Sequence, residues 1–75
     1  MKCGKTAIAT ALGCELADLD SYQPTRCKSV FTDGNRYYTS RPDNGKSLDG
    51  WEPLGANWFV RIYHIQIFVR EEAPD

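Results

Sequence analysis

Residues 59–69 form the densest apolar stretch of the sequence, FVRIYHIQIFV, and they constrain the fold most. The stretch is rich in β-branched and aromatic residues and contains neither glycine nor proline, which is typical of a strand. We predict one long strand over residues 58–70. The face that carries apolar side chains changes near Tyr63 and His64, which predicts a bulge or bend there, because one extra residue turns every later side chain over. The alternative is a strand covered on both sides.

The first part of the chain, residues 1–23, is predicted to be helical. Residues 4–20 contain no proline. Apolar side chains recur on one helical face every three or four residues: Ile8, Leu12, Leu16 and Leu19. Gly13 interrupts the pattern, and a glycine inside a helix costs about 1 kcal/mol relative to alanine. In a second interpretation the helix therefore breaks at Gly13 and restarts at Leu16.

Under that second interpretation this part of the chain resembles a helix-turn-helix. The resemblance rests on the spacing of the apolar residues, a small residue and a turn glycine: Ile8, Ala9, Leu12, Gly13, Cys14, Leu19 and Tyr22. The helix that would enter a DNA groove, residues 15–22, carries three acidic residues and no lysine or arginine. That charge opposes contact with phosphates, so a conventional recognition helix is not expected.

Residues 26–41 are predicted to form a β-hairpin. Two strand-like runs, residues 28–32 and 36–40, flank the sequence Asp-Gly-Asn at 33–35. These three residues tolerate the positive φ that a tight turn requires. With a three-residue loop, Phe31 would face Tyr37 and Val30 would face Tyr38.

The remaining segments are a loop and a tail. Residues 42–57 contain several glycines and prolines and are predicted to be a loop, part of which folds back over the sheet because it carries Trp51 and Leu54. Residues 71–75 are expected to be a frayed acidic tail. The sequence thus predicts a single small α+β domain, residues 1–75. Its N-terminal helix, with the break at Gly13 left open, packs on a three-stranded antiparallel sheet made of the hairpin and the long C-terminal strand.

The sequence contains no pattern that indicates catalysis, a cofactor or a metal. His64 is the only histidine, and we expect it to be half-buried in the strand rather than catalytic. The cysteines at 3, 14 and 27 lack the close pairing that zinc sites use. Nine basic and ten acidic residues give a net charge of −1, which provides no general attraction to nucleic acid or to a membrane. We therefore expect a protein that is not an enzyme and that binds no cofactor or metal.

The cysteine count also bears on location. Three cysteines, without a recognisable secretory signal, favour reduced thiols and a cytoplasmic protein. No stretch reaches the ~20 apolar residues that cross a membrane. The free edge of the long strand would allow a homodimer through strand pairing.

Aromatic residues beside arginines predict the binding surface, because tryptophan, tyrosine and arginine dominate the binding energy at protein interfaces. The candidate partner-binding residues are Arg36, Tyr37, Tyr38, Arg41, Trp51 and Trp58. We expect a small accessory or inhibitor protein that occupies a surface on a larger protein or ribonucleoprotein partner. Phage and other mobile elements encode many proteins of this kind, for instance antagonists of a host defence complex.

The alternative function is nucleic-acid binding through the basic hairpin, used as a wing beside a helix-turn-helix or as a platform for single strands. The candidate residues for this function are Arg26, Lys28, Arg36 and Lys46. Basic residues on a hairpin have a simpler explanation, since lysine and arginine on strand edges block edge-to-edge pairing.

Overall fold

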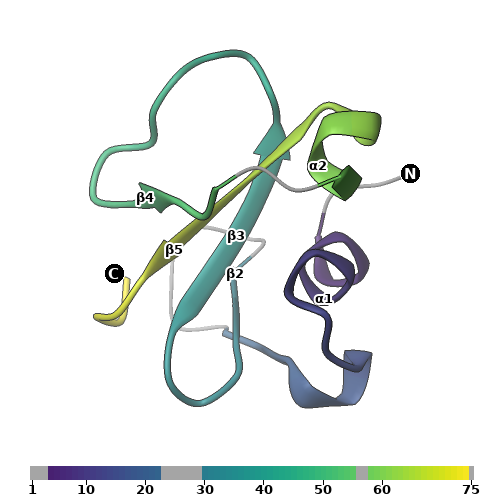
Figure 1. Cartoon of the computed structure of the whole chain (residues 1–75). Helices are drawn as coiled ribbons and strands as arrows, with labels where there is room; N and C mark the ends of the chain where they lie inside the picture. Colours follow the sequence, from purple (N-terminus) through teal and green to yellow (C-terminus); the bar gives the residue numbers. More distant parts are fainter. Residues whose placement is uncertain (1–3, 23–29, 56–57, 75) are drawn as a thin grey trace.

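A computed structural model gives the structure of the protein and describes residues 4–22, 30–55 and 58–74 (Figure 1). The elements in chain order are α1 (Lys5–Leu12), the 3-10 turn η1 (Leu16–Asp18), β1 (Asp20–Ser21), β2 (Val30–Thr32), β3 (Tyr37–Pro42), β4 (Glu52–Pro53), α2 (Trp58–Tyr63) and β5 (Ile65–Arg70). All neighbouring strands are antiparallel, in the order β1-β2-β3-β5-β4. The predicted α+β class is confirmed.

The prediction of three strands is wrong, because the described residues already form a sheet of five. The two strands that were missed, β1 and β4, lie at the edges and are only two residues long, too short to show an alternating pattern in the sequence. β5 lies between β3 and β4, so along Phe68 and Val69 it has no free edge. Formation of a homodimer by strand pairing stays a prediction. It was based on a free edge of the long strand, and β4 occupies part of that edge.

The N-terminal helix ends at the glycine where the sequence allowed a break. Gly13 adopts a φ of 77°, which is easy only for glycine. The N–H of Gly13 donates to the Thr10 carbonyl (3.3 Å) and the N–H of Cys14 to the Ala9 carbonyl (3.1 Å), the pair of bonds that closes a Schellman motif. The single 3-10 turn η1 and then β1 follow. Residues 15–22 therefore do not form the second helix of a helix-turn-helix.

Residues 58–70 do not form the single long strand that was predicted. The first six residues are the helix α2, and the strand β5 begins only at Ile65. The predicted change of direction near Tyr63 and His64 is found at His64, whose φ is 53°. It is a left-handed turn rather than a bulge.

The pairing of β4 with β5 explains why a long strand cannot form here. The Leu54 N–H donates to the Ile67 carbonyl at 2.8 Å, which fixes Leu54 beside Ile67. The chain from Leu54 to Trp58 reaches at most ~14 Å, whereas a straight strand would carry Trp58 about 30 Å from Ile67. The chain must therefore turn back between β4 and β5, and α2 makes that turn despite its strand-like composition.

The hairpin is present, but its predicted pairing is off by one residue. Thr32 lies opposite Tyr37, Phe31 opposite Tyr38 and Val30 opposite Thr39. The loop therefore contains four residues instead of three. The reason is the Asp33 side chain, whose Oδ1 accepts hydrogen bonds from the N–H groups of Asn35 (2.9 Å) and Arg36 (3.0 Å) and so holds Arg36 inside the turn.

The two faces of the sheet pack against different parts of the chain. Residues opposite each other in an antiparallel sheet share a face, so the strand pairing assigns each side chain to one face. The face that we call the helix face meets α1, in a core that contains Ala7, Ile8, Ala9, Leu19, Tyr38, Ile65 and Ile67. The opposite face, the loop face, is covered by the segment between β3 and β4, in a second core of Val30, Trp51 and Phe68 with Tyr22, Tyr37 and Leu48. Figure 1 shows both helices on one side of the sheet and this segment looping out on the other.

The predicted folding back of residues 42–57 over the sheet is therefore confirmed for Trp51 and Leu54. Trp51 packs against Phe68 on the loop face. Leu54 packs against the helix-face core instead. These two residues bracket β4 and anchor it from both sides of the sheet.

Candidate functional site

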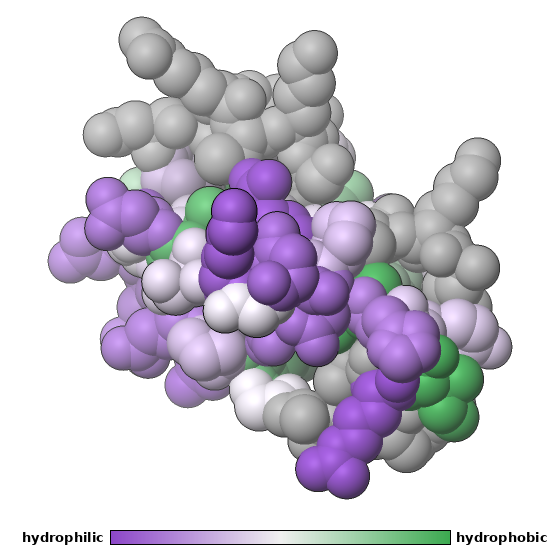
Figure 2. Space-filling model, turned by 90° about the horizontal axis from the view of Figure 1, so that it is seen from above, coloured by the Kyte–Doolittle hydropathy of each residue, from purple (hydrophilic) through white to green (hydrophobic). Residues whose placement is uncertain are grey.

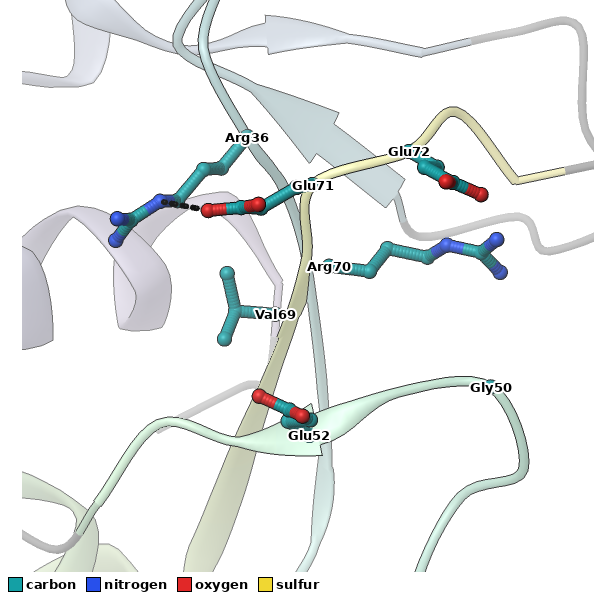
Figure 3. A pocket seen from close by; sticks show the side chains of 7 residues that line it. All are labelled: Arg36, Gly50, Glu52, Val69, Arg70, Glu71 and Glu72. Carbon is teal, nitrogen blue, oxygen red and sulfur yellow. Dashed lines mark ion pairs between the residues drawn. The ribbon is translucent and has the colours of Figure 1, made fainter.

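An open groove of about 510 Å³ lies at the C-terminal end of β5. Its lining residues are Arg36, Gly50, Glu52, Val69, Arg70, Glu71 and Glu72 (Figure 3). Val69 and Arg70 leave β5 on opposite sides, and Glu52 extends from β4 below them. The groove therefore joins the edge of the helix face to the edge of the loop face.

The guanidinium of Arg70 is held by an aromatic ring. Its central carbon lies 5.6 Å from the centre of the Trp51 ring, within the range of a cation–π contact. Gly50, which precedes Trp51, lies beside the same guanidinium and has a φ of 83°, a conformation that favours glycine. The Arg70 Nε is buried, and it has no hydrogen-bond partner among the described residues.

The charges around the groove are mixed. Arg36 Nε lies 3.8 Å from Glu71 Oε1, in an ion pair whose two side chains are exposed (Figure 3). An exposed pair of this kind contributes at most about 1 kcal/mol to stability. Within the described part of the chain, Glu52 and Glu72 form no ion pair. The groove thus presents three carboxylates and two guanidinium groups. One carboxylate and one guanidinium, those of Glu71 and Arg36, are paired with each other.

The hairpin turn beside the groove is held by the Asp33 carboxylate. The N–H of Asn35 donates to it, as do the N–H of Arg36 and the Tyr38 hydroxyl, and together these bonds place the pKa of Asp33 below its ordinary value. Burial of the Tyr38 side chain and then the negative charge of Asp33 raise the pKa of Tyr38. The turn therefore positions Arg36 at the groove with little freedom at its backbone.

The structure brings only some of the predicted partner-binding residues to one surface. Tyr37 and Trp51 contribute to the loop face, and Arg36 lines the groove next to them. Tyr38 is only 4% exposed and belongs to the helix-face core. The prediction that Tyr38 joins the binding surface is therefore wrong, because neighbouring residues of a strand point to opposite faces.

The other predicted residues are spread over the molecule. Arg41 is exposed at the end of β3. Lys46 is exposed and lines a smaller cavity of about 240 Å³ between the loop and the loop face. Trp58 is the first residue of α2, and its side chain is outside the described part. Arg26 and Lys28 also lie outside the described residues.

Several groove residues were missed from the sequence. They are Gly50, Glu52, Val69, Arg70, Glu71 and Glu72. Arg70 was treated as the end of a core strand, and Glu71 and Glu72 as a frayed tail. Part of the signal was present, because Trp51 was already a candidate for the binding surface. The partner above that ring could not be known without the pairing of β4 and β5.

His64 and Cys14 do not line the groove. His64 is exposed at the turn between α2 and β5, so the expectation of a half-buried side chain is wrong. Cys14 is a free thiol that packs partly buried against the helix-face core. In residues 4–22, 30–55 and 58–74, no group of three or more histidine, cysteine, aspartate or glutamate side chains could hold a metal ion.

The longest helix within the described ranges, α1, has eight residues, and none of the helices there has the length and hydropathy needed to span a membrane.

No protein-family model, curated protein sequence or solved structure matches the chain. The function is therefore argued from the geometry of the chain itself.

Proposed function

We propose that this chain is a small protein-binding module that acts without catalysis, and that its binding surface is the groove together with the adjoining part of the loop face. The observation that carries the proposal is the Arg70 side chain, held on the Trp51 ring at the rim of the groove. Arginine and tryptophan are the residues that most often dominate protein interfaces. A side chain that is already ordered loses less conformational entropy when a partner binds.

The charge of the groove supports a protein partner over a nucleic acid. Three carboxylates face two guanidinium groups, and phosphates would be repelled by the excess negative charge. A protein partner can present both signs of charge and match this pattern. Base stacking on the hairpin would also need exposed aromatic rings, and Tyr38 is buried in the core.

The side of the molecule away from the groove is mostly hydrophilic. Figure 2 shows the molecule from above, where hydrophilic residues dominate and hydrophobic atoms are confined to small separate areas. The coloured residues on this side form no broad apolar patch that would compete with the groove (Figure 2), so the ordered polar and aromatic groups of the groove are the better candidates for binding. Binding of this kind is compatible with an accessory or inhibitor protein that masks a surface on a larger partner.

The experiment that tests the proposal is affinity capture from the source cell with three versions of the full chain. The first is wild type. The second carries Arg36→Ala and Glu72→Ala, two exposed groove substitutions that leave both cores intact. The third, a matched control, carries Arg41→Ala and Asp49→Ala, which also remove one positive and one negative charge but lie outside the groove.

We expect wild type and the control to capture the same protein and the groove variant to capture at least tenfold less of it. A tenfold loss of affinity corresponds to ~1.4 kcal/mol of binding free energy, which is a modest loss for an interface hot spot. Equal capture by all three versions would show that the groove is not the binding surface. Nuclease treatment distinguishes protein binding from the alternative, nucleic-acid binding. Capture that is lost when nucleic acid is digested, and that weakens steeply between ~50 and ~200 mM salt, would indicate nucleic-acid binding instead.

A further inference from the structure

The segment that forms α2, Trp58–Tyr63, has a sequence that conflicts with its structure. Its residues WFVRIY are mainly aromatic and β-branched, the types that favour strands and are weak helix formers. The helix has only six residues, and helices of this length have no stability of their own. Tertiary contacts must therefore hold it in place.

The C-terminal end of α2 is exposed to solvent. Ile62 is 60% exposed and Tyr63 is 42% exposed. His64, which ends the helix, is the one non-glycine residue with a positive φ within the described ranges. A left-handed conformation is unfavourable for any residue with a Cβ, and such strain is often found where a segment switches between two states.

The β3–β5 ladder already continues into this turn. Pro42 and Ile65 are the last residues paired as strand, yet the N–H of Asp43 donates to the His64 carbonyl at 2.8 Å. A change of the His64 backbone to extended values would therefore lengthen β5 in its present register. Tyr63 would then follow the side of Ile65 and Ile67, since side chains alternate along a strand.

What prevents this change is β4. The distance argument made for the fold shows that residues 58–63 cannot extend β5 while Leu54 stays beside Ile67. The two residues of β4 are exposed and Pro53 has no N–H to donate, so β4 is held on β5 mainly through the flanking Trp51 and Leu54. Release of β4 and extension of β5 are thus coupled.

We propose that residues 58–63 are a helix–strand switch, with His64 as its hinge and β4 as its latch. In the first state α2 is helical and β4 pairs with β5. In the second state residues 58–64 extend β5, and β4 leaves its edge. The second state frees the backbone groups of β5 that now face β4, including the Ile67 carbonyl, for another strand.

The test uses two substitutions at the hinge with opposite expected effects. His64→Gly removes the strain of the left-handed conformation and favours the helical state, whereas His64→Val adds a β-branched side chain that strongly disfavours it. Each is expected to change the ratio of the two states by about fivefold or more, which corresponds to ~1 kcal/mol. The readouts, from NMR of the full chain, are the Cα and Cβ chemical shifts of residues 58–63 and the hydrogen-exchange protection of the Leu54 amide.

In His64→Val we expect the shifts of residues 58–63 to move from wild type toward strand values and the protection of Leu54 to fall, and in His64→Gly both to move the opposite way. Ile62→Ala is the second variant, because it replaces an exposed side chain by a better helix former and should behave like His64→Gly without disturbing the core. The same shifts and the same Leu54 protection in wild type and all variants would overturn the proposal. So would random-coil shifts in His64→Val with Leu54 still protected, since they would show a helix that melts without extending β5.

Discussion

The Tyr38 hydroxyl donates a hydrogen bond of 3.2 Å to Asp33 Oδ2, across the turn that joins β2 to β3. The same carboxylate accepts two backbone N–H groups through Oδ1. A single side chain therefore links the turn to a residue of the helix-face core. Through this link, the position of Arg36 in the groove depends on the packing of the sheet against α1.

Asp33→Ala should destabilise the fold by about 1–2 kcal/mol, because the turn loses the acceptor of three hydrogen bonds, one of them from a core tyrosine. Chemical denaturation measures the loss. Asp49→Ala is the control, since Asp49 is an exposed carboxylate with no such bonds to the described residues, and it should change stability by less than about 0.5 kcal/mol. Equal effects of the two substitutions would mean that the turn does not depend on the Asp33 side chain.

Stability should fall at both ends of the pH range for two separate reasons. The pKa of Asp33 is lower in the folded chain, so its contribution is present above about pH 4, the unfolded value, and is lost as the pH falls through the folded value. The pKa of Tyr38 is higher in the folded chain, so its contribution is present below about pH 10 and is lost as the pH rises. Denaturation midpoints measured against pH check both limbs.

The two limbs can be assigned by substitution. Asp33→Asn should flatten the acid limb, and Tyr38→Phe should flatten the alkaline limb. If both variants keep the wild-type pH profile, other groups control it.

Gly13→Ala should destabilise the protein by about 1 kcal/mol or more, because Gly13 has a φ of 77° at the end of α1 and alanine is strained in that conformation. The space around the residue is open, since no atom lies within 4 Å of a Cβ placed there, so the effect isolates the backbone. Gly13→Asn, which tolerates the left-handed region better, should cost less. A thermal unfolding series of the three proteins gives the order, and an unchanged midpoint for Gly13→Ala would contradict the helix end described above.

Ile8→Ala tests the helix-face core. Ile8 is fully buried, with 0% exposure, and removal of such a side chain costs about 2–5 kcal/mol. Leu16→Ala is the matched control, because Leu16 is also a large aliphatic residue but is 48% exposed, and it should cost below about 1 kcal/mol. Similar losses for both would mean that α1 does not cover the sheet as described.

How far the sequence predicts this structure depends on the range of the interactions involved. Gly13, the turn at Asp33 and the return of Trp51 to the sheet are local signals. The sequence left the break at Gly13 open as one of two interpretations, predicted the hairpin with a loop one residue too short, and predicted the return of Trp51. The helix at 58–63 was missed because local propensity favours a strand there, while the constraint that decides the outcome is the pairing of Leu54 with Ile67. The groove was missed for the same reason, since Trp51 and Arg70 meet only once β4 has paired with β5.

Arg70→Met separates a role in stability from a role in binding. The substitution removes the cation–π contact with Trp51, worth about 0.5–1 kcal/mol at an exposed site. It also removes the buried Nε that has no partner among the described residues, and an unsatisfied buried donor costs about 1–3 kcal/mol. The methionine stem still covers the ring, so the folded state should be as stable as wild type or slightly more so, which denaturation would show. If Arg70 serves the binding of a partner, capture should nevertheless fall at least tenfold. A variant that is clearly less stable and still captures the partner would instead assign Arg70 to the fold.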